Sequence, residues 1–209
     1  MNTTSCLGLR LHWFALLFVA LGLVADGVSS APAGPYYGFY PSSLGPSHKV
    51  LRHNLFGFQI DMPSDWNFGV NARGGLPVVL LYPPNMNTTQ ITDAYQSIEI
   101  GSLPLPKISL EEAHRHLMTG MRMSHPALRE VEPPVRVKVQ NAEALQSLFT
   151  WQSKSQVEIA EWVTLVDNAH GIRSVTVRSA YGLFKRQRGM LRSLTATFQA
   201  FEPRVPDGE

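Results

Sequence analysis

The chain has 209 residues, of which 44% are hydrophobic and 16% are charged. This composition excludes a disordered protein, because it supplies enough apolar surface to bury a core. Eighteen Lys and Arg against sixteen Asp and Glu give a net charge of +2, which is too balanced for a dedicated nucleic-acid-binding protein. The length fits one folded domain. The single cysteine, Cys6, excludes an intramolecular disulfide and a cysteine-rich metal site.

Residues 1–30 have the features of a secretory signal peptide. Arg10 precedes an apolar run at 13–25, which would span only about 20 Å as a helix, whereas a bilayer core is roughly 30 Å thick. Small residues follow the run, and cleavage after Ser30 fits them. We therefore expect an exported protein, periplasmic or secreted, that begins at Ala31 and has no integral membrane domain. The alternative is an anchor formed by an uncleaved N-terminal helix.

Residues 31–47 contain seven Pro or Gly and no charged residue. This composition is typical of an extended linker and disfavours both a helix and a central strand. Four aromatic rings lie within it, at Tyr36, Tyr37, Phe39 and Tyr40. These rings either pack along the edge of the domain or stack on a sugar or a partner.

A regular pattern begins after this segment and predicts one domain over residues 48–203, followed by a short tail at 204–209. Alternating apolar residues, short apolar runs and β-branched residues indicate strands. Asn168 and Gly171 delimit a predicted hairpin turn. The predicted strands are 55–63, 76–82, 95–101, 135–139, 145–152, 156–166 and 172–179.

The first predicted helix begins with a capping box. Ser109 is followed three residues later by Glu112, so that the hydroxyl and the carboxylate can each satisfy an exposed backbone N–H group. An apolar stripe follows, formed by Leu110, Ala113, Leu117 and Met121.

The second predicted helix begins near residue 183. Its apolar residues occupy an arc of about 120°, as expected for a helix that covers a core. These residues are Leu183, Phe184, Met190, Leu191, Leu194, Phe198 and Phe201. The order of elements predicts an α+β fold, in which two principal helices cover a mainly antiparallel β-sheet.

The segment at 54–66, Asn-Leu-Phe-Gly-Phe-Gln-Ile-Asp-Met-Pro-Ser-Asp-Trp, resembles the start of PsbP-like and DcrB-like domains. The order of helices and strands that follows is also similar, and the resemblance covers roughly residues 49–203. It implies a PsbP-like α/β sandwich and a binding or assembly protein of the bacterial type, not an enzyme. It brings no catalytic residues to this chain.

Trp66 is the residue that this motif singles out. We expect its indole to fold over the sheet as part of the core, with ligand stacking as the alternative. Asp61 and Asp65 lie beside it in the sequence and could form a carboxylate pair for acid–base chemistry, although turn and capping roles explain such aspartates more simply. An extracytoplasmic hydrolase or small-ligand receptor with a cleft near these three residues is the alternative function.

No motif of a nucleophile elbow, a zinc helix or a phosphate loop occurs in the chain. His114 and His116 form the closest histidine pair, but this spacing places them on different faces of a helix. The sequence therefore indicates no catalytic residue, metal site or cofactor. Asn87 begins a glycosylation sequon in an expected loop.

The charge distribution is uneven near the C-terminus. Between Asp167 and Glu202 there is no acidic residue, but there are six basic residues. Lys185, Arg188 and Arg192 form a stripe beside the apolar face of the last helix. Carboxylates from elsewhere, such as Glu111 and Glu112, could neutralise this stripe.

Taken together, these features predict an exported, non-enzymatic binding or assembly protein of the cell envelope. We expect its partner, a protein or an anionic envelope surface, to dock on the basic face formed by Lys185, Arg188 and Arg192.

Overall fold

The computed structural model describes residues 36–73, 76–84, 86, 96–102 and 108–204, which form two antiparallel sheets and two principal helices. The smaller sheet has the strand order β1-β2-β3-β11. Its strands are β1 (Tyr37–Pro41), β2 (His48–His53), β3 (Phe58–Pro63) and β11 (Gln199–Ala200).

The larger sheet has seven strands in the order β4-β5-β6-β10-β9-β8-β7. Its strands are β4 (Asn67–Arg73), β5 (Leu76–Tyr82), β6 (Ser97–Ser102), β7 (Arg129–Val139), β8 (Ala142–Gln152), β9 (Glu158–Asn168) and β10 (Gly171–Ala180). All pairings in both sheets are antiparallel. The predicted α+β class is therefore confirmed, with two sheets instead of one.

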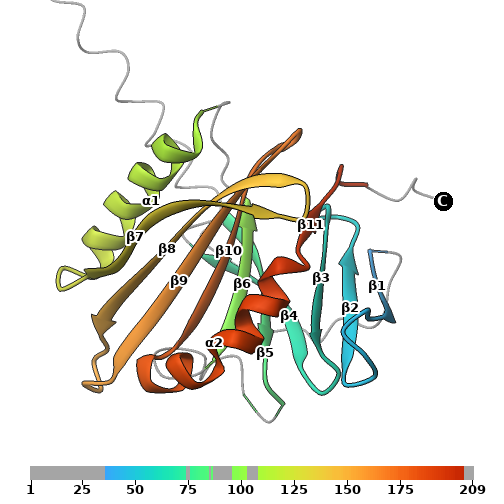
Figure 1. The fold of residues 1–209 in the computed structure, drawn as a ribbon, viewed down its shortest axis with the longest axis horizontal. Helices are drawn as coiled ribbons and strands as arrows, with labels where there is room; N and C mark the ends of the chain where they lie inside the picture. The colour runs from blue at the N-terminus through green and yellow to red at the C-terminus, as the bar shows by residue number, and fades with distance from the viewer. Residues whose placement is uncertain (1–35, 74–75, 85, 87–95, 103–107, 205–209) are drawn as a thin grey trace, which may run out of the picture.

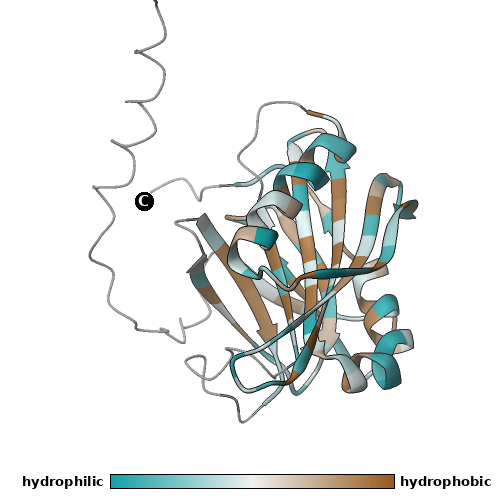
Figure 2. Ribbon diagram, turned by 90° about the vertical axis from the view of Figure 1, so that its left-hand side faces the viewer, coloured by the Kyte–Doolittle hydropathy of each residue, from teal (hydrophilic) through white to brown (hydrophobic). Residues whose placement is uncertain are grey.

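The molecule has three layers (Figure 1). Helix α1 (Leu110–Ser124) lies on one face of the seven-stranded sheet. Helix α2 (Tyr181–Ala196) and the smaller sheet lie on the opposite face. Each layer presents an apolar face to its neighbour, as Figure 2 shows by the hydrophobic bands that cross adjacent strands.

The larger of the two cores fills the space between the two sheets and α2. Phe58 and Ile60 enter it from the smaller sheet, Trp162 enters it from the larger sheet, and Phe184 and Leu194 enter it from α2. The smaller core lies under α1 and contains Leu110, Ala113 and Met118 of that helix. Because both faces of the larger sheet are covered, its interior strand β9 is buried continuously from Ile159 to Val166.

The capping box at the start of α1 is present, since Ser109 Oγ accepts a hydrogen bond of 3.2 Å from the backbone N–H of Glu112. The buried stripe differs slightly from the prediction. His114 and Met118 are buried, whereas Leu117 and Met121 are only partly buried. His114 can enter the core because its Nε2 lies 3.0 Å from Ser147 Oγ, within hydrogen-bonding distance.

The linker prediction for residues 31–47 needs a correction, because part of this segment belongs to the smaller sheet. Tyr37–Pro41 forms the edge strand β1 and pairs with β2. Proline is tolerated at an edge, where the strand bonds on one side only. The centroids of the Tyr37 ring and the Phe68 ring of β4 lie 4.7 Å apart. An aromatic contact therefore joins an edge strand of one sheet to an edge strand of the other.

Other elements also differ from the prediction, because β7 begins at Arg129 and the strands β2 and β4 were not predicted. Helix α2 ends at Ala196, and Phe198 and Phe201 lie beyond it, although Phe198 still enters the core. Strand β3 begins at Phe58, because Asn54 to Gly57 form a turn in which the Gly57 N–H bonds the Asn54 carbonyl at 3.2 Å.

Gly57 has a positive φ of 64°. A side chain there would meet the backbone carbonyl oxygen of Phe201, 2.3 Å from an added Cβ. The Phe201 N–H donates a 2.8 Å hydrogen bond to the Gly57 carbonyl. This glycine of the 54–66 motif therefore allows the C-terminal segment to pack closely against the start of the domain.

Candidate functional site

The basic stripe predicted on the last helix lies on α2, but one of its three members is already paired. The Arg188 guanidinium donates to both carboxylate oxygens of Glu132 on β7, with Nη1–Oε1 and Nη2–Oε2 distances of 2.6 and 2.7 Å. Its Cζ also lies 5.9 Å from the ring centroids of Trp162 and Phe184. Arg188 therefore links the helix to an edge strand, instead of presenting a free charge to solvent.

Lys185, Arg186 and Arg192 are exposed on the same helix. In the described part of the chain, no carboxylate lies within 4.0 Å of their basic nitrogens. Lys185 Nζ lies 4.7 Å from the ring centroid of Tyr181, which leaves its ammonium at the surface. At 100° per residue, the three side chains span an arc of about 120°. We call Lys185, Arg186 and Arg192 the α2 basic face.

The other two basic residues of the charge-biased segment lie on β10 and are held within the fold. Arg178 forms an ion pair with Glu161 on β9, and both side chains are largely buried. Arg173 is buried and donates to Ser102 Oγ; burial lowers the pKa of its guanidinium. Three of the six basic residues are thus occupied by structural contacts.

The carboxylates suggested as neutralising partners lie elsewhere. Glu111 of α1 forms an ion pair with Arg136 of β7. Glu112 lies 3.9 Å from His116 on its own helix. Within the described residues, Glu132 is the carboxylate that neutralises the stripe, and it pairs with Arg188 alone.

Asp61, Asp65 and Trp66 do not share an open cleft. Asp61 is buried, and its carboxylate accepts a hydrogen bond from Ser42 Oγ. Trp66 is 5% exposed and belongs to the larger core. Asp65 is exposed at the surface. The pair is therefore divided between the interior and solvent, which does not suit a joint acid–base role.

The histidines are also dispersed. His53 is buried among aromatic rings, and burial lowers its pKa to about 4. The ring of His125 stacks on Trp151 at 3.8 Å between centroids. Among the described residues, no group of three or more His, Cys, Asp or Glu is placed to hold a metal ion.

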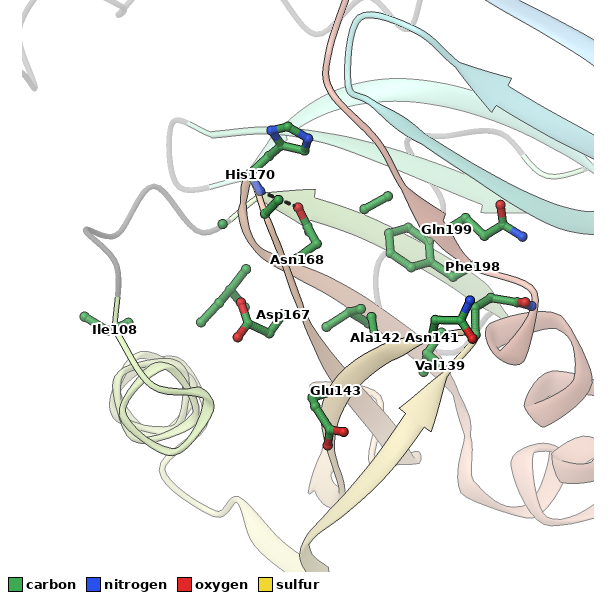
Figure 3. Close-up of a pocket in the computed structure, with 16 residues that line it drawn as sticks. Ile108, Val139, Asn141, Ala142, Glu143, Asp167, Asn168, His170, Phe198 and Gln199 are labelled. Carbon is green, nitrogen blue, oxygen red and sulfur yellow. Dashed lines mark hydrogen bonds between the residues drawn. The ribbon is translucent and has the colours of Figure 1, made fainter.

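A pocket of about 900 Å³ lies at one end of the seven-stranded sheet (Figure 3). Its walls come from the β7–β8 turn, the β9–β10 turn, the segment after α2 and Ile108 before α1. Neither Asp61, Asp65 nor Trp66 lines it. Its volume lies within the range of ligand-binding pockets, about 300–1,000 Å³.

Local sequence patterns do not indicate this pocket, because its residues come from four separate segments. Only the hairpin turn at 168–171 was predicted among its walls. The antiparallel register of β8 and β9 brings Glu143 and Asp167 to the same end of the sheet, where both line the pocket. Register of this kind depends on the packing of distant strands, which local patterns do not specify.

The predicted signal peptide and the Asn87 sequon lie outside the described residues. In the part of the chain that the structure describes, neither helix is long and apolar enough to span a membrane.

Comparison with solved structures supports the predicted fold. The chain resembles the solution structure of cyanobacterial PsbP (CyanoP) from Synechocystis sp. PCC 6803, with a TM-score of 0.56 and 11% sequence identity. The match covers 77% of this chain and 97% of that protein. A second similar structure is PA94 from Pseudomonas aeruginosa, described as a putative regulator of unknown function, with a TM-score of 0.47, 8% identity and coverage of 83% and 99%. No family model and no curated protein matches the chain. The PsbP-like α/β fold is thus confirmed.

Proposed function

We propose that this chain is an exported, non-catalytic accessory protein that binds an acidic protein surface through the α2 basic face. The observation that carries the proposal is the set of three exposed cations, Lys185, Arg186 and Arg192, on one helix. In the described residues, none of the three has a carboxylate within salt-bridge distance. Unneutralised charges of one sign attract and orient a partner of the opposite sign.

The rigidity of this face supports a docking role. Phe184, Leu191 and Leu194 bury the opposite side of α2 in the larger core, and the Arg188–Glu132 ion pair fixes the helix to β7. The three cations are therefore presented from a fixed helix, so that binding does not require ordering of the backbone. A PsbP-like fold is also consistent with a non-catalytic role, since the resemblance implies binding and assembly proteins.

Export follows from the predicted signal peptide and remains part of the proposal. If residues 1–30 are removed, the chain meets its partner in the periplasm or outside the cell. The alternative, in which residues 1–30 stay as an anchor, would place the same basic face close to the membrane.

The proposal can be tested by affinity capture from the envelope fraction of the producing organism. Wild-type protein is compared with a triple variant, Lys185→Glu, Arg186→Glu and Arg192→Glu. The matched control is Arg115→Glu, Arg122→Glu and Lys154→Glu, which reverses the same number of exposed charges away from α2. We expect one acidic protein to be recovered by the wild type and the control, and to be lost from the α2 variant.

Two outcomes would contradict the proposal. Equal recovery of partners by the wild type and the α2 variant would show that the basic face does not bind them. Recovery of anionic envelope lipid or polymer in place of a protein would assign the face to a surface instead. Circular dichroism of each variant checks that the fold is retained.

A further inference from the structure

The smaller sheet is an outer layer of the molecule, and its two faces differ. Leu51, Ile60 and Met62 point from its inner face into the larger core, so that the alternate residues of the same strands lie on the outer face. Helix α1 lies on the larger sheet and α2 belongs to the larger core. Among the described elements, no helix or further sheet therefore covers this outer face (Figure 1).

One row of side chains on the outer face crosses all four strands. Gly38 of β1 pairs with Arg52 of β2. Arg52 pairs with Gln59 of β3, which pairs in turn with Gln199 of β11. Arg52 Nη1 donates to Gln59 Oε1 at 3.4 Å, and Gln59 Nε2 donates to Gln199 Oε1 at 3.0 Å. We call Arg52, Gln59 and Gln199 the polar row; it extends over about 10 Å, because neighbouring strands lie about 4.8 Å apart.

Two aromatic rings lie beside Arg52. The Tyr40 ring lies back over Gly38, since its Oη and Cζ are 3.2 and 3.3 Å from the position of a Cβ added there. Gly38 is the cross-strand partner of Arg52, so this ring and the guanidinium are neighbours on one face. Tyr40 is 52% exposed. On the other side, the Arg52 Cζ lies 4.3 Å from the centroid of the Phe201 ring.

The charge of Arg52 is not neutralised by the surrounding protein. Among the described residues, no carboxylate lies within 4.0 Å of its guanidinium. Besides Gln59, it donates to the amide oxygen of Asn54 at 3.3 Å. Asp61, on the same face of β3, is buried and accepts a hydrogen bond from Ser42 Oγ. A ligand that carries a carboxylate complements this fixed positive charge.

The remaining groups of the outer face indicate a sugar. The amides of Gln59 and Gln199 have both donors and acceptors, as sugar hydroxyl groups do. The exposed Tyr40 ring offers apolar surface with a polar tip, against which the C–H groups of a sugar ring can pack. None of these three side chains belongs to an enclosed pocket wall except Gln199, which lines the edge of the pocket described above. An open, extended surface of this kind suits a chain of sugars.

We propose that the outer face of the smaller sheet binds an acidic polysaccharide, with a sugar ring stacked on Tyr40 and a carboxylate held by Arg52. The polar row binds the hydroxyl groups of the sugars that follow along the chain. This inference goes beyond the function proposed for α2, since it concerns a different surface and a saccharide ligand.

The binding test uses the purified protein and two acidic probes, trigalacturonic acid and a hyaluronan tetrasaccharide, in NMR titrations at physiological salt. The methyl ester of trigalacturonic acid has nearly the same shape without the charge and is the matched control ligand. We expect both acids to bind and the ester to bind at least about fivefold more weakly than its acid. Saturation transfer should reach the sugar protons from the aromatic side chains.

Three variants test the named contacts. Tyr40→Ala and Arg52→Gln should each weaken binding by about fivefold or more, since each removes one of the two main contacts. Gly38→Ala should weaken it as well, because the added Cβ displaces the Tyr40 ring. Phe39→Ala is the matched control: Phe39 is an exposed aromatic residue of the same strand, but it contacts Phe68 on the opposite face and should bind as the wild type does. Tyr40 is exposed, so its variant tests the site even if Arg52→Gln is unstable.

Several results would overturn the proposal. They are no binding of either acidic probe to the wild type, equal binding of the methyl ester, or wild-type affinity in Tyr40→Ala. Tighter binding of a capped triglutamate peptide than of either saccharide would assign the polar row to an acidic protein instead.

The triple α2 variant separates this proposal from the function proposed for α2. It should bind both acidic probes as the wild type does, and loss of binding would place the saccharide on α2 and overturn the inference. In the affinity capture, Tyr40→Ala should still recover the acidic protein that the α2 variant loses. Each proposal can therefore fail while the other stands.

Discussion

Arg188 of α2 and Glu132 of β7 form a two-point ion pair between segments 56 residues apart in the sequence. β7 is an edge strand whose register is shifted on both sides of Glu132. The ion pair thus fixes the terminal helix against the irregular part of the sheet edge. It also separates Arg188 from the α2 basic face, whose three members have no carboxylate partner among the residues that the structure describes.

We expect Arg188→Ala to lower the free energy of unfolding more than Glu132→Gln does, since the alanine variant also loses contact with Trp162 and Phe184. A double-mutant cycle should give a coupling energy of up to about 1 kcal/mol, the usual range for a partly exposed pair. Urea denaturation of the wild type, the two single variants and the double variant measures each free energy of unfolding in the cycle. Arg192→Ala is the control and should change stability by less than about 0.5 kcal/mol. Strict additivity of the two changes would show that the pair contributes nothing.

Trp66→Ala should lower the free energy of unfolding by about 3–5 kcal/mol, the usual cost of deleting a large buried aromatic side chain. The indole is 5% exposed and packs in the larger core. Trp66→Phe should have a smaller effect, because it keeps part of the buried area. A Trp66→Ala variant that melts like the wild type but loses a ligand would instead favour the stacking role.

Stability should fall as the pH is lowered from about 6.5 to about 4. Burial holds the pKa of His53 at about 4 in the folded chain, against an ordinary value of 6.5. Between these values the unfolded chain binds more protons, so that acid favours unfolding. Burial lowers the pKa of His114 as well, which acts in the same direction.

The pH dependence of the urea midpoint measures this effect. His53→Phe should flatten the slope of stability against pH in this window, whatever its absolute stability. An unchanged slope in His53→Phe would mean that His53 is not the group responsible.

The N-terminus of the exported protein should be Ala31. The short apolar run and the small residues after it fit a cleaved signal peptide. N-terminal sequencing or intact-mass measurement of the protein from its producing organism determines this directly. A membrane fraction that contains the chain with Met1 still present would support the uncleaved anchor.

Most of the fold could be predicted from local patterns. The alternation and apolar runs of the central strands, and the capping box at Ser109, depend on short stretches of sequence. The edge strand β1 could not be predicted in the same way. Its Pro- and Gly-rich sequence becomes a strand only because β2 and Phe68 provide partners from elsewhere in the fold.

The candidate sites were less predictable than the fold. Helical spacing placed Lys185 and Arg192 correctly, because the angle around a helix depends on sequence position alone. The same spacing could not show that Glu132 reaches Arg188, or that four separate segments converge on one pocket. These contacts depend on strand register and on packing between layers.

The central claim, that the α2 basic face binds an acidic partner, is tested most directly by titrating the captured partner against wild-type and variant proteins. For the wild type, the dissociation constant should rise with salt, because exposed charges are screened over about 8–10 Å at physiological ionic strength. The Lys185→Glu, Arg186→Glu, Arg192→Glu variant should bind at least about tenfold more weakly at low salt and keep the wild-type melting temperature. Equal dissociation constants for wild type and variant at low salt would contradict the account.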